Sequence, residues 1–181
     1  MLESKNVVEV LSTIYEENII IEDSIQYSGG SINQTQVLKL SNKEQVFIKT
    51  NPSPPIGFFE KEAKGLDLLR SASDGPRIPK VLGVGHGDNP QFILLEFLEN
   101  TQSNYYQNLG KSLAALHSVS NKFYGLDHDN FIGKTLQINT PESNGVIFFR
   151  DHRIGFQQDL AYKNKLLPLE LNRKIDEIKK I

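Results

Sequence analysis

The spacing of apolar residues predicts a helix followed by three strands in the amino-terminal part of the chain. Val7, Leu11 and Ile14 recur at the spacing of one helical face. Strands are predicted where β-branched and apolar residues predominate, at residues 19–27, 36–40 and 45–50. A polar turn separates the last two strands, so an antiparallel meander is expected.

The remainder of the chain alternates between strands and helices and then becomes helical. Residues 51–55 contain three prolines and are interpreted as a linker. The pattern then predicts a helix at 59–69, strands at 80–85 and 91–97, a helix at 106–116, a glycine- and asparagine-rich stretch at 121–145, and helices at 147–161 and 167–178. The composition changes near Glu99, which predicts one lobe at 1–98 and another at 99–181.

Charge and composition exclude several classes of function. The 20 Lys and Arg residues against 22 Asp and Glu give a formal net charge of −2, which argues against a nucleic-acid or membrane-surface role. There is no cysteine, so disulfides, thiolate catalysis and cysteine-based zinc sites are excluded. Neither a signal segment nor an apolar run long enough to span a bilayer is visible, and a cytoplasmic location is expected.

Lys49 is the residue around which the candidate chemistry is arranged. Side chains two apart in a strand share a face, so Phe47 and Lys49 point together while Val46 and Ile48 point to the other side. A lysine on such a face can meet nucleotide phosphates, with the aromatic ring beside the base. The alternative is a surface lysine at a strand end, with its aliphatic stem packed on the protein.

A glycine turn precedes this strand. Gly29 and Gly30 lack a Cβ atom and let the backbone approach phosphates closely. Ser31 and Asn33, on either side of Ile32, add hydroxyl and amide donors. An ordinary hairpin turn would have the same composition, so the turn alone leaves both interpretations open.

Glu62 lies in the predicted helix that follows the linker. An ion pair with Lys49 would hold the lysine toward the phosphates. Glu62 could instead belong to the solvated face of the helix. The order of glycine turn, strand lysine and helix glutamate is that of a kinase-type small lobe and favours the pair.

The predicted strand at 91–97 ends in Glu96, Phe97 and Leu98, where an apolar run meets polar residues. In a kinase this segment is the hinge, in which the C=O of Glu96 and the N–H of Leu98 would hydrogen-bond the adenine edge. A buried strand that leaves the sheet for solvent would have the same pattern.

Two further segments contain catalytic-looking residues in an unsuitable context. His86-Gly87-Asp88-Asn89 resembles a phosphotransferase catalytic loop, but the asparagine required five residues after the aspartate is replaced by Ile93. This segment is interpreted as a hairpin turn. Asp151-His152-Arg153 lies in helical periodicity and is interpreted as a polar helix face.

Taken in order, these stretches resemble the fructosamine kinase (ketosamine-3-kinase) family. The matching stretches are residues 29–33, 46–49, 59–63, 94–98, 109–117, 129–133 and 148–161. The resemblance implies an α+β, protein-kinase-like fold related to aminoglycoside phosphotransferases, with a five-stranded antiparallel small lobe, one C-type helix and the helical start of a large lobe.

The resemblance also implies the activity and the roles of the residues. Family members use ATP and magnesium to phosphorylate the sugar O3 of a ketosamine, either a small molecule or part of a glycated protein, which leads to deglycation. By this resemblance Lys49 binds phosphate, Glu62 is its partner, and residues 96–98 form the adenine hinge.

One departure from the family limits these expectations. Family members continue to a His-Gly-Asp loop with the catalytic base and an Asp-Pro segment that binds magnesium, and neither is found before Ile181. We therefore expect a truncated, inactive chain that binds nucleotide at most, with no catalytic residue or metal ligand of its own, and that self-associates through exposed large-lobe helices. The alternatives are a non-catalytic nucleotide-binding or interaction module, or another small-molecule kinase of the aminoglycoside or choline type.

Overall fold

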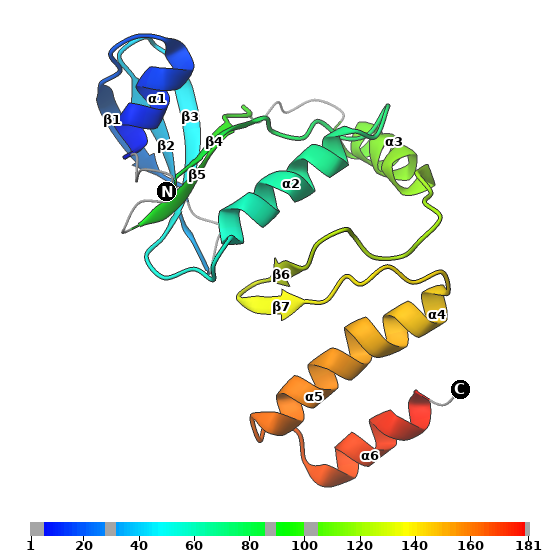
Figure 1. Cartoon of the computed structure of the whole chain (residues 1–181). Coiled ribbons are helices and arrows are strands. Elements are labelled where there is room, and N and C mark those ends of the chain that lie inside the picture. The colour runs from blue at the N-terminus through cyan, green and yellow to red at the C-terminus, as the bar shows by residue number, and fades with distance from the viewer. Residues whose placement is uncertain (1–5, 28–31, 86–89, 100–104, 180–181) are drawn as a thin grey trace. The chain divides into compact units, whose positions relative to one another are not determined.

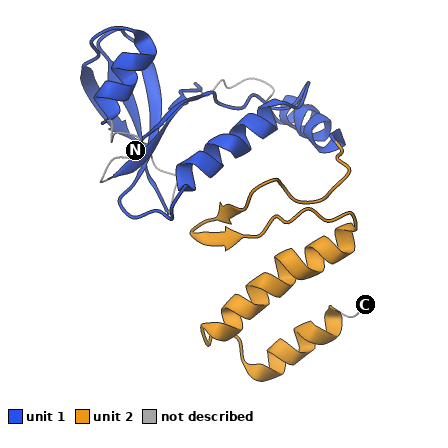
Figure 2. Cartoon of the chain, viewed as in Figure 1, with its two compact units in different colours: residues 1–119 blue, residues 120–181 orange. Residues whose placement is uncertain are grey.

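The computed structural model describes residues 6–27, 32–85, 90–99 and 105–179 (Figure 1). The chain divides into two compact units, residues 1–119 and 120–181, which are drawn in different colours in Figure 2. The lobe boundary expected between 98 and 99 lies inside the first unit, and as a functional division it stays a prediction.

A five-stranded antiparallel sheet forms the centre of the first unit. Its strands are β1 (Ile21–Gln26), β2 (Gln34–Leu40), β3 (Gln45–Asn51), β4 (Val81–Gly85) and β5 (Gln91–Glu96). Their spatial order is β1-β2-β3-β5-β4, with every neighbouring pair antiparallel. This confirms the predicted small-lobe sheet. The position of β5 between β3 and β4 explains its unbroken apolar run, because residues on both of its faces are buried.

Helix α1 (Val7–Tyr15) covers one face of this sheet (Figure 1). It begins with a capping box in which the Asn6 side chain accepts from the N–H of Glu9 and the Glu9 carboxylate accepts from the N–H of Asn6. Leu11 of α1 is fully buried in a cluster with Val46 and Ile48 of β3. Val46 and Ile48 therefore face α1, which leaves Phe47 and Lys49 on the opposite face.

Helix α2 (Phe58–Arg70) is anchored by two aromatic residues in its first turn. Phe58 and Phe59 are both buried, and their rings meet edge to face at 5.3 Å between centroids. The helix packs against β4 and β5. Because Phe59 fixes its rotation, the residue three positions later, Glu62, is directed at the sheet. The described part of the first unit ends with α3 (Tyr105–Ser118) and Val119.

The second unit combines a small hairpin with a helical pair. Strands β6 (Asn130–Ile132) and β7 (Thr135–Gln137) pair antiparallel, and Gly133 in the turn has φ +61°. The helices are α4 (Gly145–Phe148), the π-helical segment η1 (Phe149–Gly155), α5 (Phe156–Lys163) and α6 (Leu169–Ile178). The helices were predicted, but the hairpin was not, because strands of three residues are too short to show a period of two.

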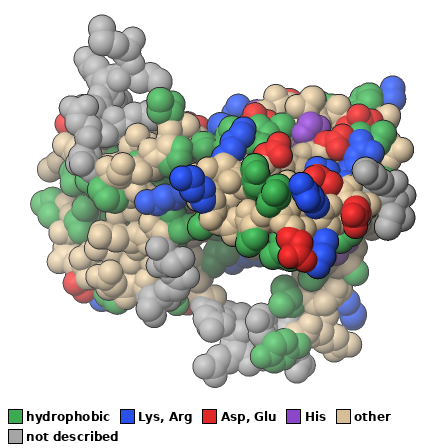
Figure 3. All heavy atoms as spheres, turned by 90° about the horizontal axis from the view of Figure 1, so that it is seen from below, with side chains coloured by type: hydrophobic (Ala, Val, Ile, Leu, Met, Phe, Trp, Pro, Cys, Tyr) green, Lys and Arg blue, Asp and Glu red, His purple; other side chains and the backbone are tan. Residues whose placement is uncertain are grey.

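Both units present mixed charge to solvent. On the face drawn in Figure 3, acidic and basic side chains are interspersed and not sorted by sign. Among the helices in the described part of the chain, none has the length and apolarity that crossing a membrane would need.

Candidate functional site

The ion pair between Lys49 and Glu62 lies at the centre of the candidate site. The Lys49 Nζ atom is 2.6 Å from Glu62 Oε1, and the two side chains are 29% and 23% exposed. A charge-assisted hydrogen bond in such a half-buried place is stronger than a solvated surface pair. The pair expected from the order of elements is therefore present, and Lys49 is fixed while it can still be reached from solvent.

The residues around Lys49 make its side of the sheet largely apolar. Ile93 lies opposite Lys49 in the β3–β5 register, and Leu95 lies opposite Phe47. The Phe47 ring meets the Tyr27 ring edge to face, with centroids 6.0 Å apart and planes at 82°. One fixed cation beside apolar and aromatic surface suits a ligand that joins a flat base to an anionic group.

The glycine turn lies largely outside the described residues, including Gly29, Gly30 and Ser31. Its stems are described. On one side the N–H of Tyr27 donates to the carbonyl of Thr35 at 3.0 Å, and the Thr35 hydroxyl donates back to the carbonyl of Tyr27 at 2.5 Å. On the other side are Ile32 and Asn33, which lead directly into β2. Residues 28–31 follow β1 and precede β2 in the sequence, and their contact with phosphate stays a prediction.

Asn51, the last residue of β3, is a site residue that the sequence analysis missed. Its side chain is buried, with 2% exposure, and its Nδ2 atom donates to the carbonyl of Ile32 and to the side chain of Asn33. An asparagine directly before proline is typical of a turn, so it was assigned to the linker at 51–55. The sequence offered one indication that Asn51 belongs to the site. Asn51 lies two positions after Lys49, so in a strand the two side chains share a face.

The predicted hinge begins where β5 ends at Glu96, and Phe97 and Leu98 follow without regular structure. The Glu96 carboxylate accepts the N–H of Lys80 at 3.1 Å and pairs with the guanidinium of Arg77. The hydrogen bond from the Lys80 backbone, followed by that from Arg77, holds the pKa of Glu96 below its usual value. The contact of residues 96–98 with adenine stays a prediction.

A buried polar network organises the second unit. Asn139 is 2% exposed, and its Nδ2 atom donates to the carbonyl of His128 at 3.1 Å and to Asn130 Oδ1 at 2.9 Å. The Arg153 guanidinium donates to Asn139 Oδ1 and to the carbonyl of Ile138, both at 2.6 Å, and lies over the Phe148 ring. Burial lowers the pKa of Arg153. Arg153 therefore points inward, and its assignment to a polar helix face was wrong.

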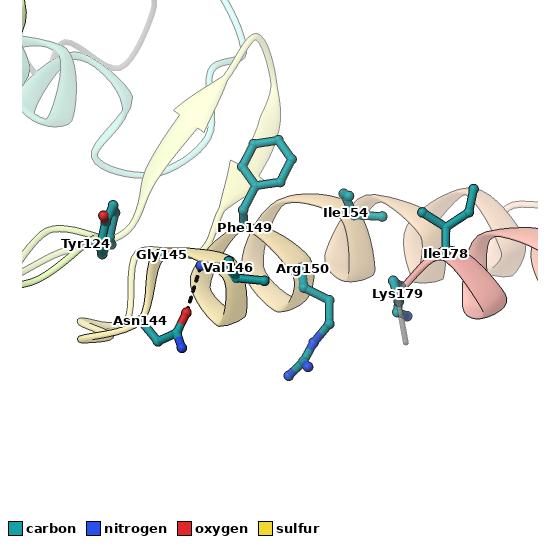
Figure 4. Close-up of a pocket in the computed structure, with 9 residues that line it drawn as sticks. All are labelled: Tyr124, Asn144, Gly145, Val146, Phe149, Arg150, Ile154, Ile178 and Lys179. Atoms are coloured by element: carbon teal, nitrogen blue, oxygen red, sulfur yellow. Dashed lines mark hydrogen bonds between the residues drawn. The ribbon is translucent and has the colours of Figure 1, made fainter. Parts of the chain in front are cut away.

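The second unit also contains an apolar groove with a volume of about 520 Å³ (Figure 4). Its lining residues are Tyr124, Asn144, Gly145, Val146, Phe149, Arg150, Ile154, Ile178 and Lys179. At one end the Asn144 side chain caps α4 by accepting from the N–H of Val146 at 2.9 Å. None of the residues predicted to bind nucleotide lines this groove.

The arrangement in the first unit defines a class of protein. A five-stranded antiparallel sheet in which a strand lysine pairs with a glutamate of the following helix is the small lobe of a protein-kinase-like phosphotransferase. The profile of the family described as "Fructosamine kinase" matches residues 3–181. The chain belongs to the fructosamine kinase family.

Two curated relatives illustrate the relationship. The "Probable ketoamine kinase" of Vibrio parahaemolyticus is 32% identical over 165 residues, which cover 89% of this chain and 57% of the relative. The chloroplastic "Protein-ribulosamine 3-kinase" of Oryza sativa subsp. japonica is 38% identical over 136 residues, which cover 73% of this chain and 39% of the relative. The chain thus spans about half the length of the relatives it matches.

Solved structures agree with the fold. A candidate fructosamine-3-kinase of Haemophilus somnus superposes with a TM-score of 0.77 at 25% identity, over 87% of this chain and 54% of that one. A second one, from Thermobifida fusca, has a TM-score of 0.76 at 22% identity and supports the fold alone. The predicted protein-kinase-like fold is confirmed.

Proposed function

We propose that this chain binds ATP in its first unit and supplies the nucleotide-binding part of a kinase that acts on ketosamines. The observation that carries the proposal is the ion pair between Lys49 and Glu62, which fixes one amine on an apolar face of the sheet. In kinases a lysine held in this way contacts the α- and β-phosphates. The nucleotide would be bound by Gly29, Gly30, Ser31, Ile32, Asn33, Phe47, Lys49, Glu62, Glu96, Phe97 and Leu98.

The names of the relatives support a ketosamine as the acceptor in the whole protein, either free or on a glycated protein. Phosphorylation of the sugar O3 would need ATP and magnesium. Within the described ranges, His, Asp and Glu residues form no group of three or more that could hold a metal ion.

Replacement of Lys49 tests the nucleotide site. We expect Lys49→Ala to weaken ATP binding by about tenfold or more, because a charged hydrogen bond to phosphate is lost. Isothermal titration of the purified chain with ATP measures this. Lys39→Ala is the matched control, since Lys39 is also a strand lysine with an acidic partner, Asp23, at 3.2 Å. Absence of saturable binding to the wild type, or equal affinity for Lys49→Ala, would reject the proposal.

A transfer assay separates binding from catalysis. The same preparations are incubated with labelled ATP and a ketosamine, and phosphate on the sugar is measured. Saturable binding without transfer would support a nucleotide-binding role for this chain. Transfer above the level of Lys49→Ala would assign kinase activity to the chain itself and would contradict the expectation of an inactive chain.

A further inference from the structure

The end of β5 is attached to the segment before β4 through both the backbone and the side chain of Glu96. The N–H of Glu96 donates to the carbonyl of Lys80 at 2.8 Å, and the N–H of Lys80 donates to Glu96 Oε2 at 3.1 Å. The guanidinium of Arg77 pairs with the other carboxylate oxygen, Oε1. Glu96 therefore holds Lys80 at two points, and both oxygens of its carboxylate are used.

These bonds lie beyond an irregularity in the β4–β5 ladder. Val81 pairs with Leu95, whereas Gly83 pairs with Leu94, so Leu82 is an extra residue on β4. An extra residue of this kind interrupts the ladder locally. On its β4 side, the position of Glu96 therefore depends on its own bonds more than on the ladder.

The Glu96 carboxylate belongs to the face of the sheet that Lys49 does not share. Glu96 is opposite Val46 in the β3–β5 register, and the side chains of residues directly opposite each other lie on the same face. Val46 packs in the buried cluster with Leu11 of α1. The carboxylate can therefore influence a ligand on the Lys49 face only through the backbone of residues 96–98.

We propose that Glu96 is a positioning residue for the base of the nucleotide, because its carboxylate fixes the start of the predicted hinge to Lys80. The role rests on the proposed function, in which the backbone of residues 96–98 hydrogen-bonds the base. Loss of the carboxylate should weaken the contacts to the base and leave the contact between Lys49 and the phosphates intact. A carboxylate that only stabilises the fold would affect both kinds of contact alike.

Glu96→Ala removes the carboxylate and keeps the backbone of the hinge. We expect the Kd for ATP to rise by about fivefold or more, and the Kd for inorganic triphosphate, which has no base, to change by less than about twofold. Isothermal titration of the whole chain with each ligand measures the two values. An unchanged Kd for ATP, or an equal rise for both ligands, would overturn the role.

Glu96→Gln tests whether the side chain acts through its acceptor oxygen. The glutamine oxygen can still accept the N–H of Lys80, so the Kd for ATP should stay within about threefold of the wild type. A rise equal to that of Glu96→Ala would overturn the attachment on which the role depends.

Glu142→Ala is the matched control. The Glu142 carboxylate also accepts a backbone N–H, from Asn144 at 3.0 Å, and it lies in the second unit, which contains none of the residues proposed to bind nucleotide. This change should leave both Kd values as in the wild type. Should Glu96→Ala fail to fold, Glu96→Ser also removes the carboxylate, and the same comparison of the two ligands decides.

Hydrogen exchange tests the attachment of the hinge without nucleotide. We expect amides in a peptide covering residues 92–99 to exchange faster in Glu96→Ala than in the wild type, with no change in α1. Unchanged exchange there would overturn the role of Glu96 whether or not ATP binds. Failure of the wild type to bind ATP would instead reject the proposed function, and with it the role that depends on it.

Discussion

At the scale of single residues, the backbone and the side chain of Glu96 belong to different features of the fold: the predicted hinge and a set of polar contacts. Its backbone lies at the predicted hinge, whereas its carboxylate connects the end of β5 to Lys80 and Arg77 in the segment before β4. The sequence analysis considered only the backbone. The side-chain contacts could not be predicted, because Arg77 and Glu96 are 19 residues apart and meet only when β4 pairs with β5.

The lowered pKa of Glu96 makes its contribution to stability dependent on pH. A carboxylate whose pKa is lower in the folded state stabilises the protein above its unfolded pKa and loses that contribution as the pH falls through the folded pKa. We expect Glu96→Gln to lower the melting temperature at pH 7, and the difference from the wild type to shrink as the pH falls below the usual value of 4.5.

Thermal melts between pH 7 and pH 3 measure this difference. Glu22→Gln is a control, because Glu22 pairs with Lys43, which is 81% exposed, and should contribute little. The difference in melting temperature between Glu96→Gln and the wild type could instead stay constant over this range. That result would show that ionisation of the Glu96 carboxylate does not contribute to stability.

At the scale of elements, close packing decides where glycine is required. An added Cβ at Gly85 of β4 would lie 2.0 Å from the Phe92 ring, in the buried part of β5. At Gly65, in the interior of α2, an added Cβ meets nothing within 4 Å. The two glycines look alike in the sequence, and only the strand pairing distinguishes them.

The same substitution should therefore have opposite effects at the two positions. We expect Gly85→Ala to destabilise the chain by about 1–3 kcal/mol, because Phe92 must move within a packed core. Gly65→Ala should stabilise it by about 0.5–1 kcal/mol, because alanine is the better helix former. Urea unfolding followed by circular dichroism measures both. Destabilisation by Gly65→Ala, or no effect of Gly85→Ala, would contradict the packing of these elements.

At the scale of the whole molecule, the two units differ in how much apolar surface they bury. All the buried hydrophobic side chains in the described ranges lie in the first unit except Phe148. In the second unit Val146, Phe149 and Ile178 line the groove and are 71%, 59% and 62% exposed. A unit with so little apolar burial gains stability when another surface covers it.

We propose, as the sequence analysis predicted, that the chain associates with itself through these helices. Sedimentation velocity should show a mass that rises with protein concentration, and the double variant Val146→Ser, Phe149→Ser should remain monomeric. Ile56→Ser is the control, since Ile56 is 95% exposed and lies in the first unit. A wild type that is monomeric at all concentrations and melts cooperatively would favour the self-contained binding module.

The sequence by itself predicted the strands of the sheet and the two helices that pack on it, and the order of its elements favoured the pairing of Lys49 with Glu62 that the structure contains. These features depend on local periodicity and on the order of elements, which a single sequence displays directly. Residues 86–89 were expected to form a turn, but they lie outside the described residues, so that interpretation stays a prediction.

Only the tertiary structure decided the roles of Asn51, Asn139 and Arg153. Each is a polar residue that local pattern assigns to a turn, a loop or a helix surface, yet each is drawn inward by partners distant in sequence. The physical reason is that a buried polar group must be hydrogen-bonded, and the partners that permit its burial are brought together only when the chain folds.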